Sequence, residues 1–257
     1  MKIKFWGVRG SLPATSSLDQ NKEHIQNVLK SFIRAGFKSE ADIQTFFDSR
    51  SISEICGYGQ NTTCVQVRDG SSHLLIDGGS GLKVYGDHML KHHPERNQHH
   101  ILMSHFHYDH IMGLPFFSQH FIPGQEIHYY AVQPDCEKVI RSLFMRPLFP
   151  LNYENLSAKI HFHTIQPYVK NQINGFEVSA YRLDHPDPCY GFRVEKNGKV
   201  YAHAVDHEAE RMVPADLGPD AELFKNVDLL YIDAQYTESE MAQKKGWGHG
   251  TYDRAFE

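Results

Sequence analysis

Short runs of hydrophobic residues recur along most of the chain, separated by Gly, Pro, Asp or Asn. The runs are strand-length and rich in β-branched or aromatic residues, a pattern typical of β-strands. The predicted strands are Lys2–Trp6, Thr63–Val67, His73–Ile76, His100–Ser104, Ile127–Val132, Lys159–His163, Phe176–Leu183, Lys199–Ala204 and Val227–Ile232. Many short strands with only occasional helices favour a layered α/β sandwich of two sheets with outer helices over a single doubly wound sheet.

The segment from about residue 18 to residue 50 departs from this pattern. In HIQNVLKSFIRAGF the apolar residues fall at helical spacing, and Gly36 is a C-terminal stop signal. Ser39, followed three residues later by Asp42, marks the start of a second helix. We therefore predict a helical hairpin inserted between the first two strands, serving either as a packed decoration or as a lid or an arm for homodimer formation.

Composition indicates one folded domain over residues 1–257. Hydrophobic residues make up 40% and charged residues 22% of the 257 residues, so the chain is not mainly disordered. The formal charge is 26 − 31 = −5, which argues against stable binding to nucleic acid. No apolar run reaches the roughly 18 residues of a membrane helix, and the N-terminus lacks a signal-peptide core, so no membrane association is expected.

The four cysteines indicate a reducing environment. Cys56, Cys64, Cys136 and Cys189 are scattered and form no CxxC pair. In a chain of this length they are interpreted as reduced thiols of a cytoplasmic protein.

Histidine is unusually frequent, with 18 residues, and one cluster carries chemical information. The predicted strand HILMS leads directly into His105-Phe106-His107-Tyr108-Asp109-His110. A turn after a strand projects several side chains toward one point, and imidazole with carboxylate suits Zn, Mn, Fe or Ni. Three histidines and an aspartate within six positions therefore predict a metal site.

The motif His-x-His-x-Asp-His resembles the signature of the metallo-β-lactamase-fold hydrolases, and the resemblance extends along almost the whole chain. KFWGVRGSLPA, GQNTTCVQV, LLIDGGSGL, LDHPDPCYGFRVE and YAHAVDHE are similar to successive segments of that family. The segment GWGHGTYDRA is similar to the one that carries a leaving-group histidine in the ribonuclease Z and cyclic phosphodiesterase branch. The resemblance implies a four-layered αββα sandwich.

The resemblance also implies two divalent metal ions, zinc above all, with manganese or iron as alternatives. The first ion would be held by three histidines, the second by a carboxylate and a histidine, and one further carboxylate would bridge both. In that order these residues are His105, His107 and His185, then Asp109 and His110, and finally Asp206.

The implied reaction uses a water that bridges the two ions, because cations lower its pKa and also clamp the anionic substrate. Asp109 would orient the resulting hydroxide or take its proton. His249 would protonate the departing oxygen or stabilise charge on the phosphoryl oxygens.

Two features depart from the family pattern. His207, directly after Asp206, is either a donor that supports the site or a surface substitution, and the surface interpretation is favoured. The family's last ligand to the second metal follows the leaving-group histidine, but the chain ends at Glu257. Either His249 is itself that ligand, or the chain is truncated and the second site is incomplete. Truncation is favoured.

The fold alone does not determine the substrate. The segment around His249 favours phosphodiesters, and the basic arm of tRNA-processing relatives is not evident in this acidic sequence. The prediction is a metal-dependent hydrolase of a cyclic nucleotide or other small phosphodiester. The alternatives are a tRNA 3′-end processing-type endonuclease and a non-catalytic metal-binding sensor. The aromatic stretch 144–153, with Phe116 and Phe117, either lines a substrate pocket or belongs to the core.

Overall fold

The computed structural model describes residues 1–55 and 59–256. Its first sheet has six strands in the order of the sequence. The strands are β1 (Lys2–Gly7), β2 (Cys64–Asp69), β3 (Ser72–Ile76), β4 (Gln98–Leu102), β5 (Glu126–Ala131) and β6 (Lys159–Thr164). The pairs β1–β2 and β2–β3 are antiparallel, whereas β3 to β6 run parallel to one another. The carboxyl ends of the parallel strands therefore meet at one edge of the sheet.

The second sheet has five strands, in the order β11-β10-β9-β8-β7. The strands are β7 (Asn171–Ile173), β8 (Phe176–Arg182), β9 (Tyr190–Lys196), β10 (Lys199–Ala204) and β11 (Leu229–Ile232). Only β10 and β11 are parallel; the other neighbouring pairs are antiparallel.

Three hydrophobic clusters define the layers. The inner cluster lies between the sheets and joins residues such as Val65 and Leu74 to Phe176 and Phe192. Helices α4 (Gly81–His92) and α6 (Cys136–Leu143) pack on the outer face of the first sheet. The 3-10 helix Gly218–Leu223, just after α7 (Pro214–Leu217), covers part of the outer face of the second sheet. This arrangement confirms the predicted αββα sandwich.

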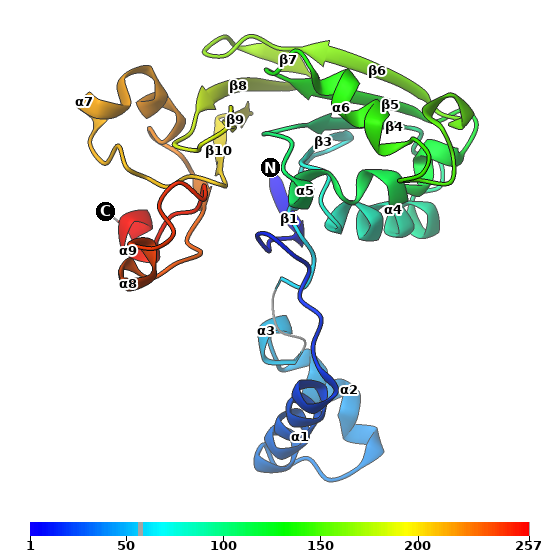
Figure 1. Ribbon diagram of the computed structural model, residues 1–257. Coiled ribbons are helices and arrows are strands. Elements are labelled where there is room, and N and C mark those ends of the chain that lie inside the picture. Colours follow the sequence, from blue (N-terminus) through cyan, green and yellow to red (C-terminus); the bar gives the residue numbers. More distant parts are fainter. Residues whose placement is uncertain (56–58, 257) are drawn as a thin grey trace.

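The predicted helical insertion is present between β1 and β2. It consists of α1 (Leu18–Arg34), α2 (Ile43–Asp48) and α3 (Ile52–Ile55), and it projects from the body of the molecule (Figure 1). A capping box between Ser17 and Gln20 starts α1, because each residue's side chain accepts the other's backbone N–H. Helix α1 buries no residue, so its role as decoration, lid or dimer arm stays a prediction.

Each predicted strand is present, with ends that move by at most two residues, whereas β7 and β9 were not predicted. Phe117 and Phe144 are fully buried in the core under α4 and α6, which supports the core interpretation for these two aromatics.

Three cysteines are buried and free, and Cys56 lies outside the described residues. Helices α8 (Glu238–Met241) and α9 (Tyr252–Phe256) complete the elements near the C-terminus. Within residues 1–55 and 59–256, no helix has the length and hydropathy needed to cross a membrane.

Candidate metal centre

The candidate site lies where strands of both sheets end. Strand β4 is buried except for its first residue, and it runs into a turn that carries His105 and His107 before α5 (Tyr108–Ile111). His185 follows β8 and Asp206 follows β10, so the second sheet supplies the remaining side chains. Residues separated by up to 101 positions are thereby brought to one place.

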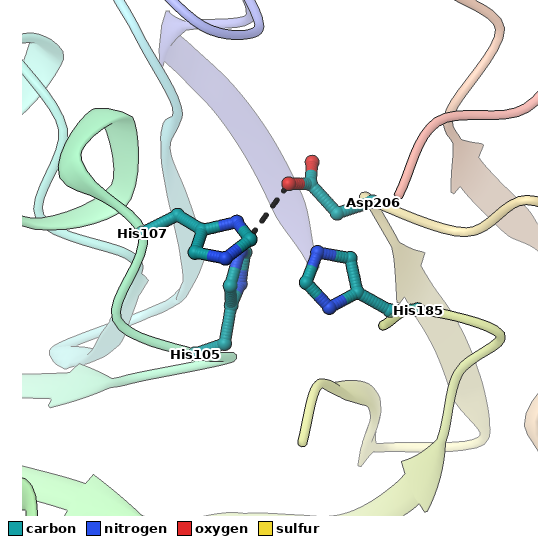
Figure 2. A group of neighbouring side chains, drawn as sticks. All are labelled: His105, His107, His185 and Asp206. Atoms are coloured by element: carbon teal, nitrogen blue, oxygen red, sulfur yellow. Dashed lines mark ion pairs between the residues drawn. The ribbon is translucent and has the colours of Figure 1, made fainter. Parts of the chain in front are cut away.

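The first group consists of His105, His107, His185 and Asp206, whose ligand atoms all lie within 4.8 Å of one another (Figure 2). The ring of His105 lies 4.6 Å, between centroids, from the rings of both His107 and His185. His105 Nε2 is 3.4 Å from Asp206 Oδ2. The structure thus brings together the three histidines predicted for the first ion.

A second contact fixes the orientation of each histidine ring. His107 Nε2 is 2.9 Å from Asp187 Oδ2, and His185 Nδ1 is 3.0 Å from the backbone carbonyl oxygen of Asp187. His105 Nδ1 is 3.1 Å from Ser104 Oγ. Histidines that bind metals commonly use one ring nitrogen for such a contact and the other for the ion.

The free nitrogens of this group fit a metal ion. Among the described residues, buried His105 Nε2 and His185 Nε2 have no hydrogen-bond partner, a condition that costs about 1–3 kcal/mol for each group. Burial and the neighbouring charge of His110 lower the pKa of His105 to about 4, against the opposing effect of Asp206. His105 is therefore neutral near pH 7, which is the form that binds a metal.

A second group consists of Asp109, His110 and Asp206. His110 Nε2 is 3.1 Å from Asp206 Oδ2 and 3.7 Å from Asp109 Oδ2. On the other side of the ring, Nδ1 is 2.9 Å from Asp77 Oδ2, and Asp77 also accepts hydrogen bonds from Ser104. Burial opposes the charged form, but Asp206 and Asp77 raise the pKa of His110 well above its usual value.

Asp206 belongs to both groups and holds a conformation that few non-glycine residues adopt, with φ of 57°. Its backbone N–H donates to Asp233 Oδ2 over 3.2 Å, which fixes this part of the loop. Although burial raises it, the pKa of Asp206 lies well below its usual value because His110 and His105 are close. One carboxylate therefore faces two imidazole groups at once.

His249 lies beside Asp206 and contacts Asp233, a residue that was not predicted. His249 Nδ1 is 2.7 Å from Asp233 Oδ2 and 3.8 Å from Asp206 Oδ1, and the three residues form a further group with the geometry of metal ligands. Burial opposes the charged form, but the hydrogen bond and charge of Asp233 raise the pKa of His249, as do Asp206 and Asp109. One sequence signal could have identified Asp233. It directly follows the predicted strand that ends at Ile232, just as Asp206 comes shortly after the predicted strand that ends at Ala204.

The favoured surface interpretation of His207 is wrong. His207 is only 3% exposed, and its Nδ1 accepts a hydrogen bond from the backbone N–H of Asp184 over 3.0 Å. Its neighbour Glu208 is also buried and accepts a hydrogen bond from the backbone N–H of Gly248 over 2.7 Å. The segment after Asp206 thus holds the backbone beside His185 and the backbone beside His249.

A cavity of about 530 Å³ opens next to these groups. Its lining includes Phe106, Asp109, Trp247 and His249. Asp109 Oδ2 accepts a hydrogen bond over 2.8 Å from the backbone N–H of Ser11, which also lines the cavity. A substrate in this cavity would contact Asp109 and His249 together.

Comparison with known proteins identifies the family. The sequence profile of the beta-lactamase superfamily domain matches residues 73–257, which is most of the chain. The chain belongs to the metallo-β-lactamase superfamily. The expected fold and family are thereby confirmed.

Ribonuclease Z proteins are distant relatives. The enzyme of Staphylococcus carnosus is 28% identical over 180 residues, covering 66% of this chain and 54% of the relative. That of Staphylococcus saprophyticus is 30% identical over 156 residues, covering 59% of this chain and 48% of the relative. This superfamily member therefore spans about half the length of the curated relatives that it matches.

Solved structures share the fold at low sequence identity. The short form of human tRNase Z has a TM-score of 0.60 at 18% identity, covering 100% of this chain and 86% of that chain. Zinc-bound PqqB from Methylobacterium extorquens has a TM-score of 0.56 at 17% identity, covering 97% and 79%. At this identity the likeness concerns the superfamily fold alone, and the roles of the individual site residues stay predictions.

Proposed function

We propose that this superfamily member is a metal-dependent phosphodiesterase that hydrolyses cyclic nucleotides or other small phosphodiesters. The observation that carries the proposal is the position of Asp206. It contacts His105 of one group and His110 of the other, and His249 lies on its remaining side. A carboxylate shared by two groups of metal ligands, with a proton donor beside it, suits two-metal hydrolysis of a phosphodiester.

The residues divide the chemistry among them. When bound, divalent ions supply Lewis-acid activation of water and neutralise charge on the phosphoryl group. Asp109, held by the N–H of Ser11, orients the attacking water and accepts its proton. His249, held by Asp233 through Nδ1, keeps Nε2 available to donate a proton to the leaving oxygen. His105, His107 and His185 would hold the first ion and Asp109 and His110 the second, with Asp206 belonging to both sets of ligands.

Two features support a small phosphodiester as the substrate. The cavity of about 530 Å³ falls within the range of roughly 300–1,000 Å³ that is typical of small-molecule sites. The formal charge of −5 disfavours a long polyanion. Zinc is the first choice for the histidine-rich group, with manganese or iron as alternatives for the oxygen-rich group.

Reconstitution tests the proposal directly. Metal-free protein is supplied with Zn²⁺, Mn²⁺ or Fe²⁺, and hydrolysis of bis(p-nitrophenyl) phosphate is followed. Turnover that depends on the metal and is abolished by Asp206→Ala supports the hydrolase. Asp228→Ala, which removes a surface carboxylate paired with Lys199, is the matched control and should leave turnover unchanged. Absence of turnover with every metal contradicts the proposal and favours a non-catalytic sensor.

A second candidate is a tRNA 3′-end processing-type endonuclease, favoured by the relatives named ribonuclease Z. Precursor tRNA carrying a 3′ trailer distinguishes the two. Cleavage of the precursor at rates above those for cyclic nucleotides would replace the small-substrate proposal with this one.

A further inference from the structure

Outside the candidate centre, three histidines form a stacked row across the first sheet. His100, His128 and His161 are direct partners in the parallel register of β4, β5 and β6. The rings of His100 and His128 stack with centroids 4.7 Å apart, and those of His128 and His161 with centroids 4.5 Å apart. His163 joins the row from the side, with its Nε2 3.1 Å from His128 Nδ1.

Two histidines of this row and a neighbouring glutamate have the geometry of metal ligands. Glu126, His128 and His161 each offer one ligand atom, and these atoms lie within 4.8 Å of one another. The 3.1 Å between the nitrogens of His128 and His163 is close to the separation of about 3.3 Å for two nitrogens around a tetrahedral ion at roughly 2.05 Å. Two or three imidazoles with one carboxylate is a donor set that suits Zn²⁺ and Ni²⁺.

The row is separate from the candidate centre. His100 precedes His105 by five residues, a distance of about 16 Å along an extended strand. Glu126 is the first residue of β5, and His161 is the third residue of β6, so both lie toward the opposite ends of the strands from the candidate centre. His161 and His163 are exposed on an edge strand, where solvent and ions reach them.

The charges around the row fit a cation. Burial and the neighbouring histidines lower the pKa values of His128 and His163, which are therefore neutral near pH 7. The hydrogen bond from Gln98 and the charge of Lys159 lower the pKa of Glu126, whose carboxylate is therefore anionic. The Lys159 ammonium is 3.5 Å from that carboxylate, but its side chain is 75% exposed and can move away.

We propose that Glu126, His128, His161 and His163 form a second, peripheral site for a divalent transition-metal ion such as Zn²⁺ or Ni²⁺. The nitrogen lone pairs of two stacked rings lie in parallel planes and therefore do not point at one common ion. The exposed ring of His161 therefore rotates about its side-chain bonds when the ion binds. The ion then ties the edge strand β6 to β5. Such a tie protects an edge that would otherwise be open to fraying or to pairing with another chain.

Metal stoichiometry and affinity test the site in the full chain. Ni²⁺ and Zn²⁺ are titrated by calorimetry into the wild type and into the double variant His128→Gln/His161→Gln. Loss of two imidazoles should remove one equivalent of metal, or weaken its binding about a hundredfold or more. Hydrolysis of bis(p-nitrophenyl) phosphate should be unchanged, because neither residue lies in the candidate centre.

The matched control removes two imidazoles that belong to none of the ligand groups found among the described residues. His24→Gln/His93→Gln changes the same number of exposed or half-buried histidines and should bind as many ions as the wild type. Unchanged stoichiometry and affinity in the His128/His161 variant overturns the proposal and shows that the row is only a packing arrangement. So does an equal loss in the control, which would indicate adventitious binding to surface histidines.

A second variant guards against misfolding. His161→Gln/His163→Gln changes only exposed side chains of the edge strand, and its far-UV circular dichroism should match that of the wild type. Added Zn²⁺ should raise Tm less for this variant than for the wild type, because the peripheral tie is lost. Equal increases in Tm, with equal metal content, would also overturn the proposal.

Discussion

Replacing Asp233 by asparagine tests whether His249 acts as the proton donor. Asp233 Oδ2 is 2.7 Å from His249 Nδ1, and its other oxygen accepts a backbone N–H from Gln235 over 3.1 Å. Asparagine has nearly the same size and retains one oxygen acceptor. The substitution therefore removes the negative charge behind the imidazole at nearly constant side-chain volume. Because Oδ2 also accepts a hydrogen bond from the backbone N–H of Asp206, metal content is measured together with turnover.

The expected effect follows from the strength of that contact. His249 is only 6% exposed, and a hydrogen bond to a charged group contributes about 1.5–3 kcal/mol. At about 1.36 kcal/mol for each factor of ten, the loss in kcat is roughly 10- to 150-fold. This loss should occur only when the leaving oxygen needs a proton.

Two substrates separate these cases. A nucleoside 2′,3′-cyclic phosphate releases an alkoxide that must be protonated, whereas bis(p-nitrophenyl) phosphate releases a stable phenolate. Asp233→Asn should slow only the first reaction, with bound metal unchanged by elemental analysis. His249→Gln should show the same selectivity, and the double variant should be little worse than either single variant, because the pair acts as a unit.

Two outcomes would refute this reasoning. Equal losses for both substrates, together with loss of metal, would show that Asp233 and His249 hold an ion with Asp206. No loss for either substrate would show that His249 takes no part. The control is Asp228→Asn, which makes the same carboxylate-to-amide change at the ion pair with Lys199. It should leave kcat unchanged for both substrates.

Three further changes have defined outcomes. Asp77→Asn, which weakens the support of His110 Nδ1, should lower metal affinity about 10- to 100-fold in a chelator competition, and unchanged affinity would contradict its positioning role. Gly248→Ala should lower both metal content and turnover, because φ is +91° there and a Cβ would overlap the ring of His185; a fully metallated variant would argue against this. Leu74→Ala, in the core between the sheets, should lower the free energy of unfolding in urea by about 2–5 kcal/mol, and a loss below about 1 kcal/mol would show that the sheets repack.

The sequence predicts most of the fold because strand and helix signals are local. The alternation of apolar residues located strands such as β4 and β5, and the stop signal at Gly36 agrees with its φ of +88°. Strand β7 was missed because it is only three residues long and begins with two polar residues, Asn171 and Gln172. No local signal marks so short an edge strand, which forms only by pairing with β8.

The candidate site was predicted where a motif is compact and missed where it depends on distant contacts. His105, His107 and His110 lie within six positions, so their convergence could be expected from the sequence. Asp233 acquires its role only when β11 pairs with β10, which brings its carboxylate to Asp206 and His249. His207 was misassigned because its burial depends on the backbone of Asp184, 23 residues away. The position of Asp233 after a predicted strand is a sequence signal, but sequence spacing does not show which distant residues such a side chain contacts.

The most direct test of the proposed centre is an anomalous difference map from crystals of the metal-loaded protein, collected at the absorption edge of zinc. We expect one strong peak among His105, His107 and His185, and a second, weaker peak beside Asp109 and His110, where only one imidazole is supplied, with the carboxylate of Asp206 between the two peaks. Each nitrogen should lie about 2.0–2.1 Å from its ion. A map without a peak within reach of His185, or with Asp206 in contact with neither ion, would contradict the account.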